Sequence, residues 1–194
     1  MQTSPTPPRR MWLALIGLVA VFGLVLIGLG REQPTPVAAP TAPAAPPPEA
    51  TPAPRVGNLA PGFRLENTSG EFVDLADLRG QVVLVNLWAS WCPPCRAEMP
   101  AIQAAYDRYG PEGFVVLAVN QGEPGPVAAG FMAEHQLNFM ALLDPYGQVG
   151  FAYQVNALPA SFFIDRNGLV RSIYKGPISH RVIAGTVEAL LAEP

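Results

Sequence analysis

The sequence predicts an α/β fold with a mixed central β-sheet flanked by helices, and three observations support this. Two nearly continuous apolar runs, residues 81–88 and 114–119, have the length and composition of strands buried on both faces. Apolar residues recur at helical spacing after each run. Two further short strands flank Asp165-Arg166-Asn167-Gly168, a strong hairpin turn. This alternation is typical of α/β proteins.

The remaining elements follow from shorter local patterns. Residues 63–65 and 72–75 alternate apolar and polar side chains around Asn67-Thr68-Ser69-Gly70, which predicts an N-terminal β-hairpin. Gly110-Pro111 ends the helix that follows the two cysteines. The other expected helices cover residues 127–136, 146–153 and 182–192, and the other expected strands cover residues 140–143, 161–164 and 169–174.

An uncharged segment, residues 11–30, predicts one transmembrane helix ahead of the fold. It is long enough to cross a hydrocarbon core of about 30 Å. Two arginines precede it, whereas Arg31 after it is offset by Glu32. The positive-inside rule therefore places residues 1–10 in the cytoplasm and the rest outside, at the cell membrane. A cleaved signal peptide is the alternative, although its apolar region is usually only about 7–15 residues long.

Residues 31–55 form a Pro- and Ala-rich linker, and residues 56–194 form the single globular domain. The linker composition cannot bury enough apolar surface to fold and favours extended polyproline II. We interpret its Pro-, Ala- and Thr-rich part, the 22 or so positions of residues 33–54, as a tether that lets the domain reach up to roughly 60 Å from the membrane, at about 3.1 Å per residue. A Pro-rich ligand for a recognition domain is the alternative.

The charge balance argues against nucleic acid as a partner. The chain has 12 Lys and Arg against 15 Asp and Glu, a net charge of -3, and the cations are scattered. A nucleic-acid-binding protein would show a basic patch or stripe.

The two cysteines, Cys92 and Cys95, are the strongest chemical signal. They lie three positions apart, between a buried strand and a helix. A disulfide that closes so short a loop would add little stability to a domain of this size. A helix N-terminus favours a thiolate, so we expect Cys92 to be the nucleophile and Cys95 to attack the resulting mixed disulfide. Inert core thiols or half of a zinc site are the alternatives. Because His135 and His180 are isolated, we expect no metal and no cofactor besides the redox-active disulfide.

The residues around these cysteines resemble a known superfamily. Residues 85–95 read Val-Asn-Leu-Trp-Ala-Ser-Trp-Cys-Pro-Pro-Cys, Pro100 follows, and Leu158-Pro159 precedes a strand. This pattern is similar to the thioredoxin superfamily over about residues 56–194. Glu98 and the segment between Phe114 and Pro159 resemble the TlpA/ResA-type proteins, which are membrane-anchored, extracytoplasmic and associated with cytochrome c maturation.

The resemblance implies roles for further residues. Pro159 should follow a cis peptide bond and lie against the cysteines, and Leu158 should shape a substrate groove; an ordinary trans proline is the alternative. Apart from the resemblance, Trp91 borders the cysteines and is expected to pack on the substrate, with shielding of the disulfide as the alternative, and Pro93 and Pro94 are also expected to contact the substrate.

Thioredoxins carry a buried Asp where this chain has Asn86, and an Asn cannot take a proton from Cys95. Glu98, three residues after Cys95 on the same helix face, is the expected substitute, with a raised pKa if partly buried. A solvated surface carboxylate is the alternative.

The leading functional hypothesis is a reductase of disulfides in extracytoplasmic proteins. Its substrates would be protein thiols and disulfides, with apocytochrome c as one candidate, and a membrane electron donor would re-reduce it. A peroxiredoxin-like thiol peroxidase is an alternative, but its motif requires Pro at Val85 and Thr at Ala89. A Sco-like copper-binding chaperone is another, but it would need one more residue between the cysteines.

Overall fold

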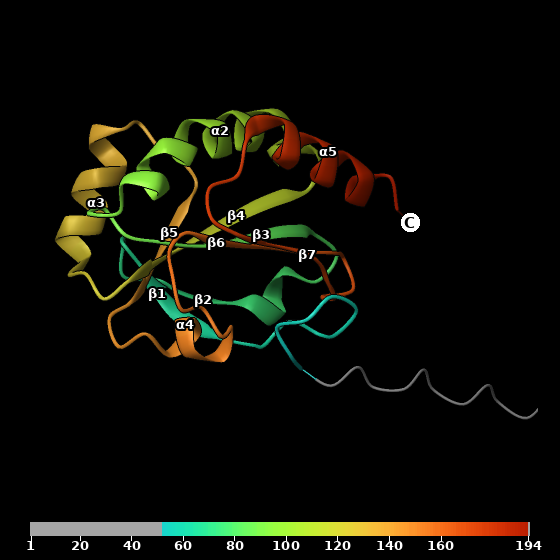
Figure 1. The fold of residues 1–194 in the computed structure, drawn as a ribbon, viewed down its shortest axis with the longest axis horizontal. Helices are drawn as coiled ribbons and strands as arrows, with labels where there is room; N and C mark the ends of the chain where they lie inside the picture. The colour runs from blue at the N-terminus through green and yellow to red at the C-terminus, as the bar shows by residue number, and fades with distance from the viewer. Residues whose placement is uncertain (1–51, 194) are drawn as a thin grey trace, which may run out of the picture. The chain divides into compact units, whose positions relative to one another are not determined.

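The computed structural model describes residues 52–193, which form the predicted mixed sheet with helices on both sides (Figure 1). The sheet has seven strands in the order β2-β1-β5-β4-β3-β6-β7. In chain order the elements are β1 (Arg64–Asn67), β2 (Phe72–Asp74), the 3₁₀ helix η1 (Leu75–Leu78), β3 (Val82–Trp88), α2 (Pro93–Tyr109), the 3₁₀ helix η2 (Gly110–Glu112), β4 (Phe114–Gln121), α3 (Gly125–Glu134), β5 (Met140–Asp144), α4 (Gln148–Ala152), β6 (Ala160–Ile164), β7 (Val170–Lys175) and α5 (His180–Leu191).

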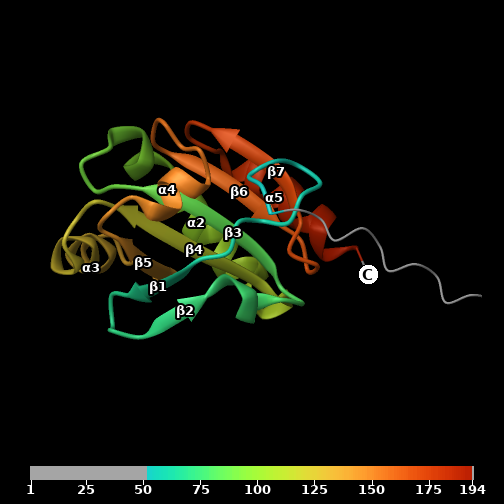
Figure 2. The same ribbon diagram turned by 90° about the horizontal axis from the view of Figure 1, so that it is seen from below.

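The centre of the sheet agrees with the apolar runs in the sequence. All seven residues of β3 are buried, and β3 lies between β4, its parallel neighbour, and β6, its antiparallel neighbour (Figure 2). β4 also pairs in parallel with β5. A strand covered by neighbours on both edges and by side chains on both faces tolerates almost no polar residue. The exception in β3 is Asn86, which is fully buried and belongs to the site described below.

Two apolar clusters fill the space on either side of the sheet. One contains Met99 and Ile102 of α2, Phe131 of α3 and Val187 of α5, together with both cysteines. The other packs α4 and η1 against the opposite face. The helix that carries the cysteines therefore lies on the same side of the sheet as α5.

The predicted element boundaries needed small corrections. The N-terminal hairpin is confirmed as the antiparallel pair β1 and β2, but η1 was not predicted. The last helix begins at His180, two residues earlier than expected, because the Ser179 side chain caps it by accepting a hydrogen bond from the Val182 backbone N–H (3.4 Å).

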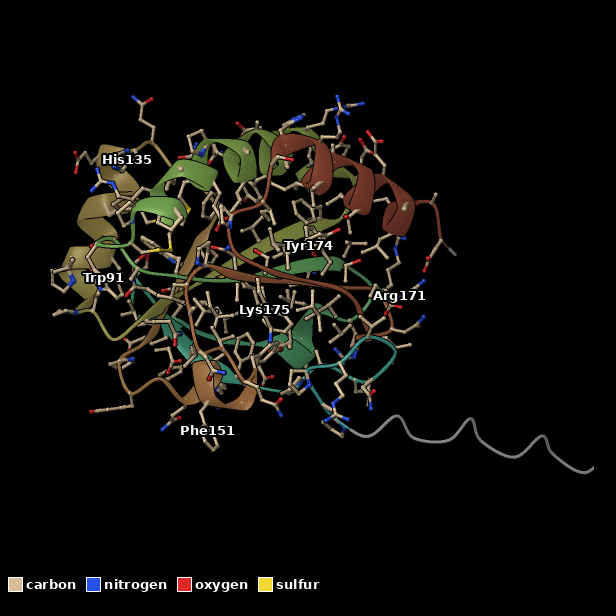
Figure 3. The ribbon with its side chains drawn as sticks, in the orientation of Figure 1. Trp91, His135, Phe151, Arg171, Tyr174 and Lys175 are labelled. Carbon is tan, nitrogen blue, oxygen red and sulfur yellow. A yellow bond between two sulfur atoms is a disulfide. The ribbon has the colours of Figure 1, made fainter. Side chains whose placement is uncertain are left out.

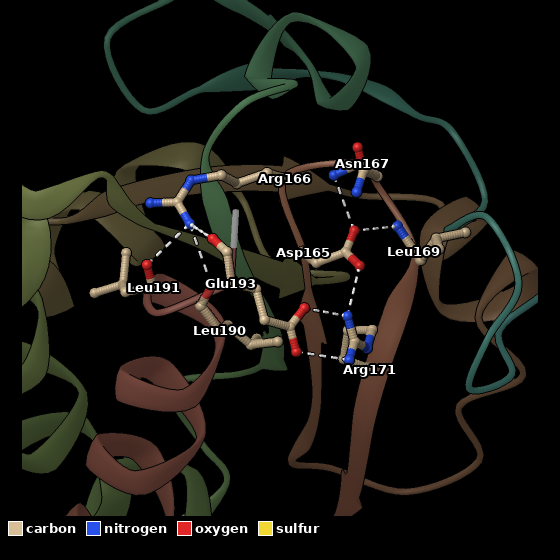
Figure 4. A network of polar contacts seen from close by, with 8 residues as sticks. All are labelled: Asp165, Arg166, Asn167, Leu169, Arg171, Leu190, Leu191 and Glu193. Atoms are coloured by element: carbon tan, nitrogen blue, oxygen red, sulfur yellow. Dashed lines mark hydrogen bonds and ion pairs between the residues drawn. The ribbon is translucent and has the colours of Figure 1, made fainter.

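The hairpin between β6 and β7 is tied to the end of α5 (Figure 4). One Arg166 nitrogen donates hydrogen bonds to the carbonyls of Leu190, Leu191 and Glu193, at 2.9–3.2 Å. Arg171 pairs with Asp165 at 3.0 Å and with the Glu193 carboxylate. Cations at a helix C-terminus satisfy the last carbonyls and complement the helix dipole. This arrangement fixes the end of α5 that is remote from the cysteines.

Within residues 52–193, no helix has the length and apolar character needed to cross a membrane. The predicted transmembrane helix at 11–30, the cytoplasmic residues 1–10 and most of the linker at 31–55 lie outside the described residues.

Candidate active site

The two cysteines are joined by a disulfide at the N-terminus of α2. Their Cα atoms lie 5.3 Å apart, and both residues are buried. Cys92 is the N-cap, and its Sγ accepts a hydrogen bond from the Cys95 backbone N–H at 3.3 Å. Pro93 and Pro94 occupy the first two helical positions, where a missing N–H costs nothing. The first N–H that the helix offers to the Cys92 sulfur is therefore that of Cys95.

The surface around the disulfide is formed by its neighbours in sequence. Trp91 is 68% exposed, and Pro93 and Pro94 are also exposed. Figure 3 shows Trp91 projecting beside the disulfide. The Cys92 backbone N–H donates to the Ala89 carbonyl (3.2 Å), which closes the turn that presents Trp91. The predicted contact of these three residues with substrate stays a prediction, but their side chains are accessible for it.

Pro159 follows a cis peptide bond, as predicted. It is buried, and its carbonyl accepts a hydrogen bond from the Gly176 backbone N–H at 2.8 Å. Leu158 is half-buried and packs against both apolar clusters, one of which contains the cysteines. Leu158 and Pro159 also line a cavity of about 290 Å³. The predicted contact of Pro159 with the cysteines and the predicted role of Leu158 in a substrate groove stay predictions.

Glu98 is buried rather than solvated, which excludes the alternative of a surface carboxylate. Only 2% of it is exposed. One carboxylate oxygen accepts a hydrogen bond from Asn86 Nδ2 and the other accepts one from the Ile178 backbone N–H, both at 2.8 Å. Burial raises the pKa of Glu98 to about 7, although the two hydrogen bonds oppose this shift. Glu98 lies one turn after Cys95 on the buried face of α2. Because its pKa is raised to about 7, this carboxyl can change protonation near neutral pH.

Asn86 and Ser161 can adapt to either protonation state of Glu98. Asn86 Nδ2 also donates to Ser161 Oγ at 2.9 Å, while Asn86 Oδ1 is buried without a partner among the described residues. If Glu98 is protonated, rotation of the Asn86 amide lets Oδ1 accept from the carboxylic acid and from the Ser161 hydroxyl. An Asp at this position, as in thioredoxins, would instead place a second acid beside Glu98.

A second buried carboxylate, Glu123, supports the active-site turn and was not predicted from the sequence. It lies after β4 and accepts hydrogen bonds from the Ser90 backbone N–H (2.7 Å), the Ser90 hydroxyl (2.5 Å) and Asn120 Nδ2 (2.6 Å). Ser90 directly precedes Trp91, so Glu123 holds the start of the turn that carries Trp91 and Cys92. The signal available in the sequence was an acidic residue in the loop at the carboxyl end of a buried parallel strand, where sites commonly form.

We expect Glu123→Ala to destabilise the protein by about 2 kcal/mol, because three donors lose their acceptor in a largely buried position. Urea unfolding of the full chain in mild detergent, followed by tryptophan fluorescence, measures the change. Glu112→Ala is the matched control. Its side chain is 50% exposed and only pairs with Arg108 at 3.7 Å, so its loss should cost less than about 0.5 kcal/mol. Equal losses in both variants would contradict the role of Glu123.

Comparison with known proteins agrees with this geometry. The family model described as the AhpC/TSA family matches residues 56–173. The chain belongs to the AhpC/TSA family. Thiol-disulfide oxidoreductase ResA of Geobacillus kaustophilus is 38% identical over 135 residues, covering 70% of this chain and 78% of the relative. ResA of Bacillus subtilis is 37% identical over 127 residues, covering 66% and 71%.

Solved structures agree with the sequence relatives. A protein of Chlorobium tepidum assigned as the thiol:disulfide interchange protein DsbE has a TM-score of 0.67 and 36% identity, covering 71% of this chain and 99% of that one. A protein of Neisseria meningitidis assigned as a thioredoxin has a TM-score of 0.63 and 31% identity, covering 68% and 88%. This AhpC/TSA-family chain is therefore a thioredoxin-like thiol–disulfide oxidoreductase of the ResA/DsbE type.

The part of the chain that the structure describes contains no cluster of potential metal ligands. Between residues 52 and 193, no three His, Cys, Asp or Glu side chains gather as a potential metal site. The expectation that no metal or other cofactor is needed stays a prediction.

Proposed function

We propose that this oxidoreductase reduces disulfides in extracytoplasmic proteins, using the Cys92–Cys95 dithiol. The observation that carries the proposal is the buried disulfide at the start of α2 with Glu98, whose pKa is raised to about 7, one helical turn beyond it. A buried acid of this kind suits proton transfer to and from a thiol at neutral pH.

The reaction begins with the reduced protein. The Cys92 thiolate attacks one sulfur of the substrate disulfide, that S–S bond breaks, and the other substrate sulfur leaves as a thiolate that takes a proton from solvent. Cys95 then gives its proton to the Glu98 carboxylate, and its sulfur attacks the Cys92 sulfur. The mixed disulfide breaks, and the second substrate sulfur leaves and is protonated. Two electrons have moved from the two cysteines to the substrate.

The setting of this reaction rests on the sequence. The uncharged segment 11–30 would anchor the chain in the cell membrane, and the Pro-rich residues 31–55 would tether the domain outside. A membrane dithiol donor would return two electrons and restore the Cys92–Cys95 dithiol. The resemblance to TlpA/ResA-type proteins, which are associated with cytochrome c maturation, makes apocytochrome c the candidate substrate.

A comparison of oxidants tests the reductase proposal. Reduced full-length protein in detergent is mixed with insulin or with hydrogen peroxide, and oxidation of the dithiol is followed by tryptophan fluorescence. We expect faster oxidation by insulin, with one dithiol consumed per insulin disulfide. Faster oxidation by peroxide would instead indicate a peroxidase. Protease added to spheroplasts tests the location: the domain should be digested, and a protected domain would contradict it.

A further inference from the structure

The cavity beside Pro159 combines apolar walls with one cation. Val155, Ala157, Leu158, Pro159 and Phe162 are among its lining residues, and Lys175 also lines it. Its volume of about 290 Å³ can accept one large side chain. Ala160, which follows Pro159, pairs with Leu87 of β3, and Cys92 lies four residues after the last residue of that strand, Trp88. The cavity therefore lies at the end of the sheet where the turn to Cys92 begins.

Lys175 faces this cavity because of the register of the sheet. It is the last residue of β7 and pairs with Ala160, the first residue of β6. Paired residues of an antiparallel ladder project to the same face. Ala160 and Phe162 belong to the apolar cluster on the α4 side. Figure 3 shows Lys175 on that side of the β6–β7 ribbon, as the register requires.

Lys175 is available to bind an anion. It is exposed and is the only lysine of the chain. It makes no ion pair with any carboxylate of residues 52–193, where the pairs are those of Arg108 with Glu112 and of Arg171 with Asp165 and Glu193. A lysine that stands at the rim of an apolar cavity without a partner can attract a carboxylate from a bound molecule.

We propose that this cavity selects substrate segments with a large apolar side chain next to the reactive cysteine and an acidic residue close by. The apolar side chain enters between Leu158 and Phe162, and the carboxylate pairs with Lys175. This inference rests on the proposed reductase function and adds a substrate class to it. The pairing favours encounter with acidic segments and disfavours basic ones, since like charges repel at the same position.

Synthetic peptides test this preference. Three peptides carry one cysteine, blocked as a disulfide with 2-mercaptoethanol, and Leu next to it. The first peptide carries Glu on both sides of the Cys-Leu pair, the second carries Gln there, and the third carries Lys. The second-order rate constant for oxidation of the reduced full-length protein is measured by acid quench and mass spectrometry. We expect the rates to follow Glu > Gln > Lys, with about a tenfold difference between the extremes. Replacing Leu with Ala should slow the Glu peptide by about tenfold.

Two charge-reversed variants assign the preference to Lys175. Lys175→Glu should reverse the order of the three peptides. Arg108→Glu makes the same change in net charge. Arg108 lies in the last turn of α2, about 24 Å along the helix from Cys92 at 1.5 Å per residue, so this variant should keep the wild-type order of the peptides. Hydroxyethyl disulfide, which is too small to fill the cavity, should react equally with all three proteins. The same peptide order in wild type and Lys175→Glu would overturn the proposal.

Failure of the proposed function gives a different result. If wild type reduces neither hydroxyethyl disulfide nor any peptide, the reductase function is refuted. The cavity is then tested by titrating the oxidised protein with the same peptides carrying Ser in place of Cys. Tighter binding of the Glu peptide that is lost in Lys175→Glu would support the cavity, and equal binding of the three peptides would refute it.

Discussion

Cys92→Ser should abolish disulfide reduction, whereas Cys95→Ser should trap the substrate as a stable mixed disulfide. Cys92 is the N-cap of α2, so its sulfur receives the field of the helix N-terminus and the Cys95 N–H. It is flanked by the exposed Trp91 and Pro93, where a substrate can approach. Cys95 is fully buried and is bonded to the Cys92 sulfur. Attack therefore starts at Cys92, and release requires Cys95.

Trapping distinguishes these roles directly. Each reduced variant is incubated with insulin, and non-reducing gels and mass spectrometry record any covalent complex. Only Cys95→Ser should accumulate one, and the complex should dissolve on addition of dithiothreitol. The double variant is the control for adventitious capture. Equal trapping by both single variants would show that either sulfur can attack.

Glu98→Gln should slow the release step by about 10²–10⁴-fold while leaving the first attack nearly unchanged. A glutamine has the same shape but cannot take a proton from Cys95. The pocket can accept it: rotation of the Asn86 amide lets the partnerless Oδ1 accept from the new Nε2, and Ile178 still donates to Oε1. The mixed disulfide should therefore accumulate with wild-type Cys residues. Rapid acid quench followed by mass spectrometry measures its formation and decay.

Glu98→Gln should also change how the free energy of unfolding depends on pH. Glu98 has a pKa of about 7 in the folded protein and 4.5 as its ordinary value, so the folded state holds the proton more tightly. The stability linked to this proton is present below about pH 4.5 and is lost as the pH rises through about 7. Between about pH 5 and about pH 8, oxidised wild type should lose about 2.5 kcal/mol relative to Glu98→Gln in urea unfolding. Parallel pH profiles would mean that Glu98 is ionised throughout.

Local sequence patterns predicted much of the fold and the reactive centre. The continuous apolar run of β3 and the N-terminal hairpin depend on neighbouring residues, and both are present. The cis bond before Pro159, which the family resemblance implied, is also present. The roles of Trp91, Pro93, Pro94 and Leu158 in substrate binding stay predictions.

The supporting contacts of the site could not be predicted because their partners are far apart in the chain. Glu98 is fixed by the backbone of Ile178, 80 positions away, and Ser90 by Glu123, 33 positions away. A backbone N–H carries no residue-type signal, and a lone Glu in a loop usually means solvent exposure. The packing of α5 on α2 brings the preceding Ile178 to Glu98, and the β4–α3 loop brings Glu123 to Ser90 in the turn before α2.

The reduction potential of the Cys92–Cys95 pair tests the central claim, a dithiol that acts as a reductant, most directly. Pro93 and Pro94 leave the Cys95 N–H as the first backbone donor in the helix to the Cys92 sulfur. Fewer donors stabilise the thiolate less, which disfavours the reduced form relative to strongly oxidising relatives. Equilibration of the full-length protein with glutathione or dithiothreitol buffers, followed by thiol alkylation and mass spectrometry, gives the value. We expect about -250 mV or lower, whereas a potential near about -120 mV, the range of a strong oxidant, would contradict the reductase function.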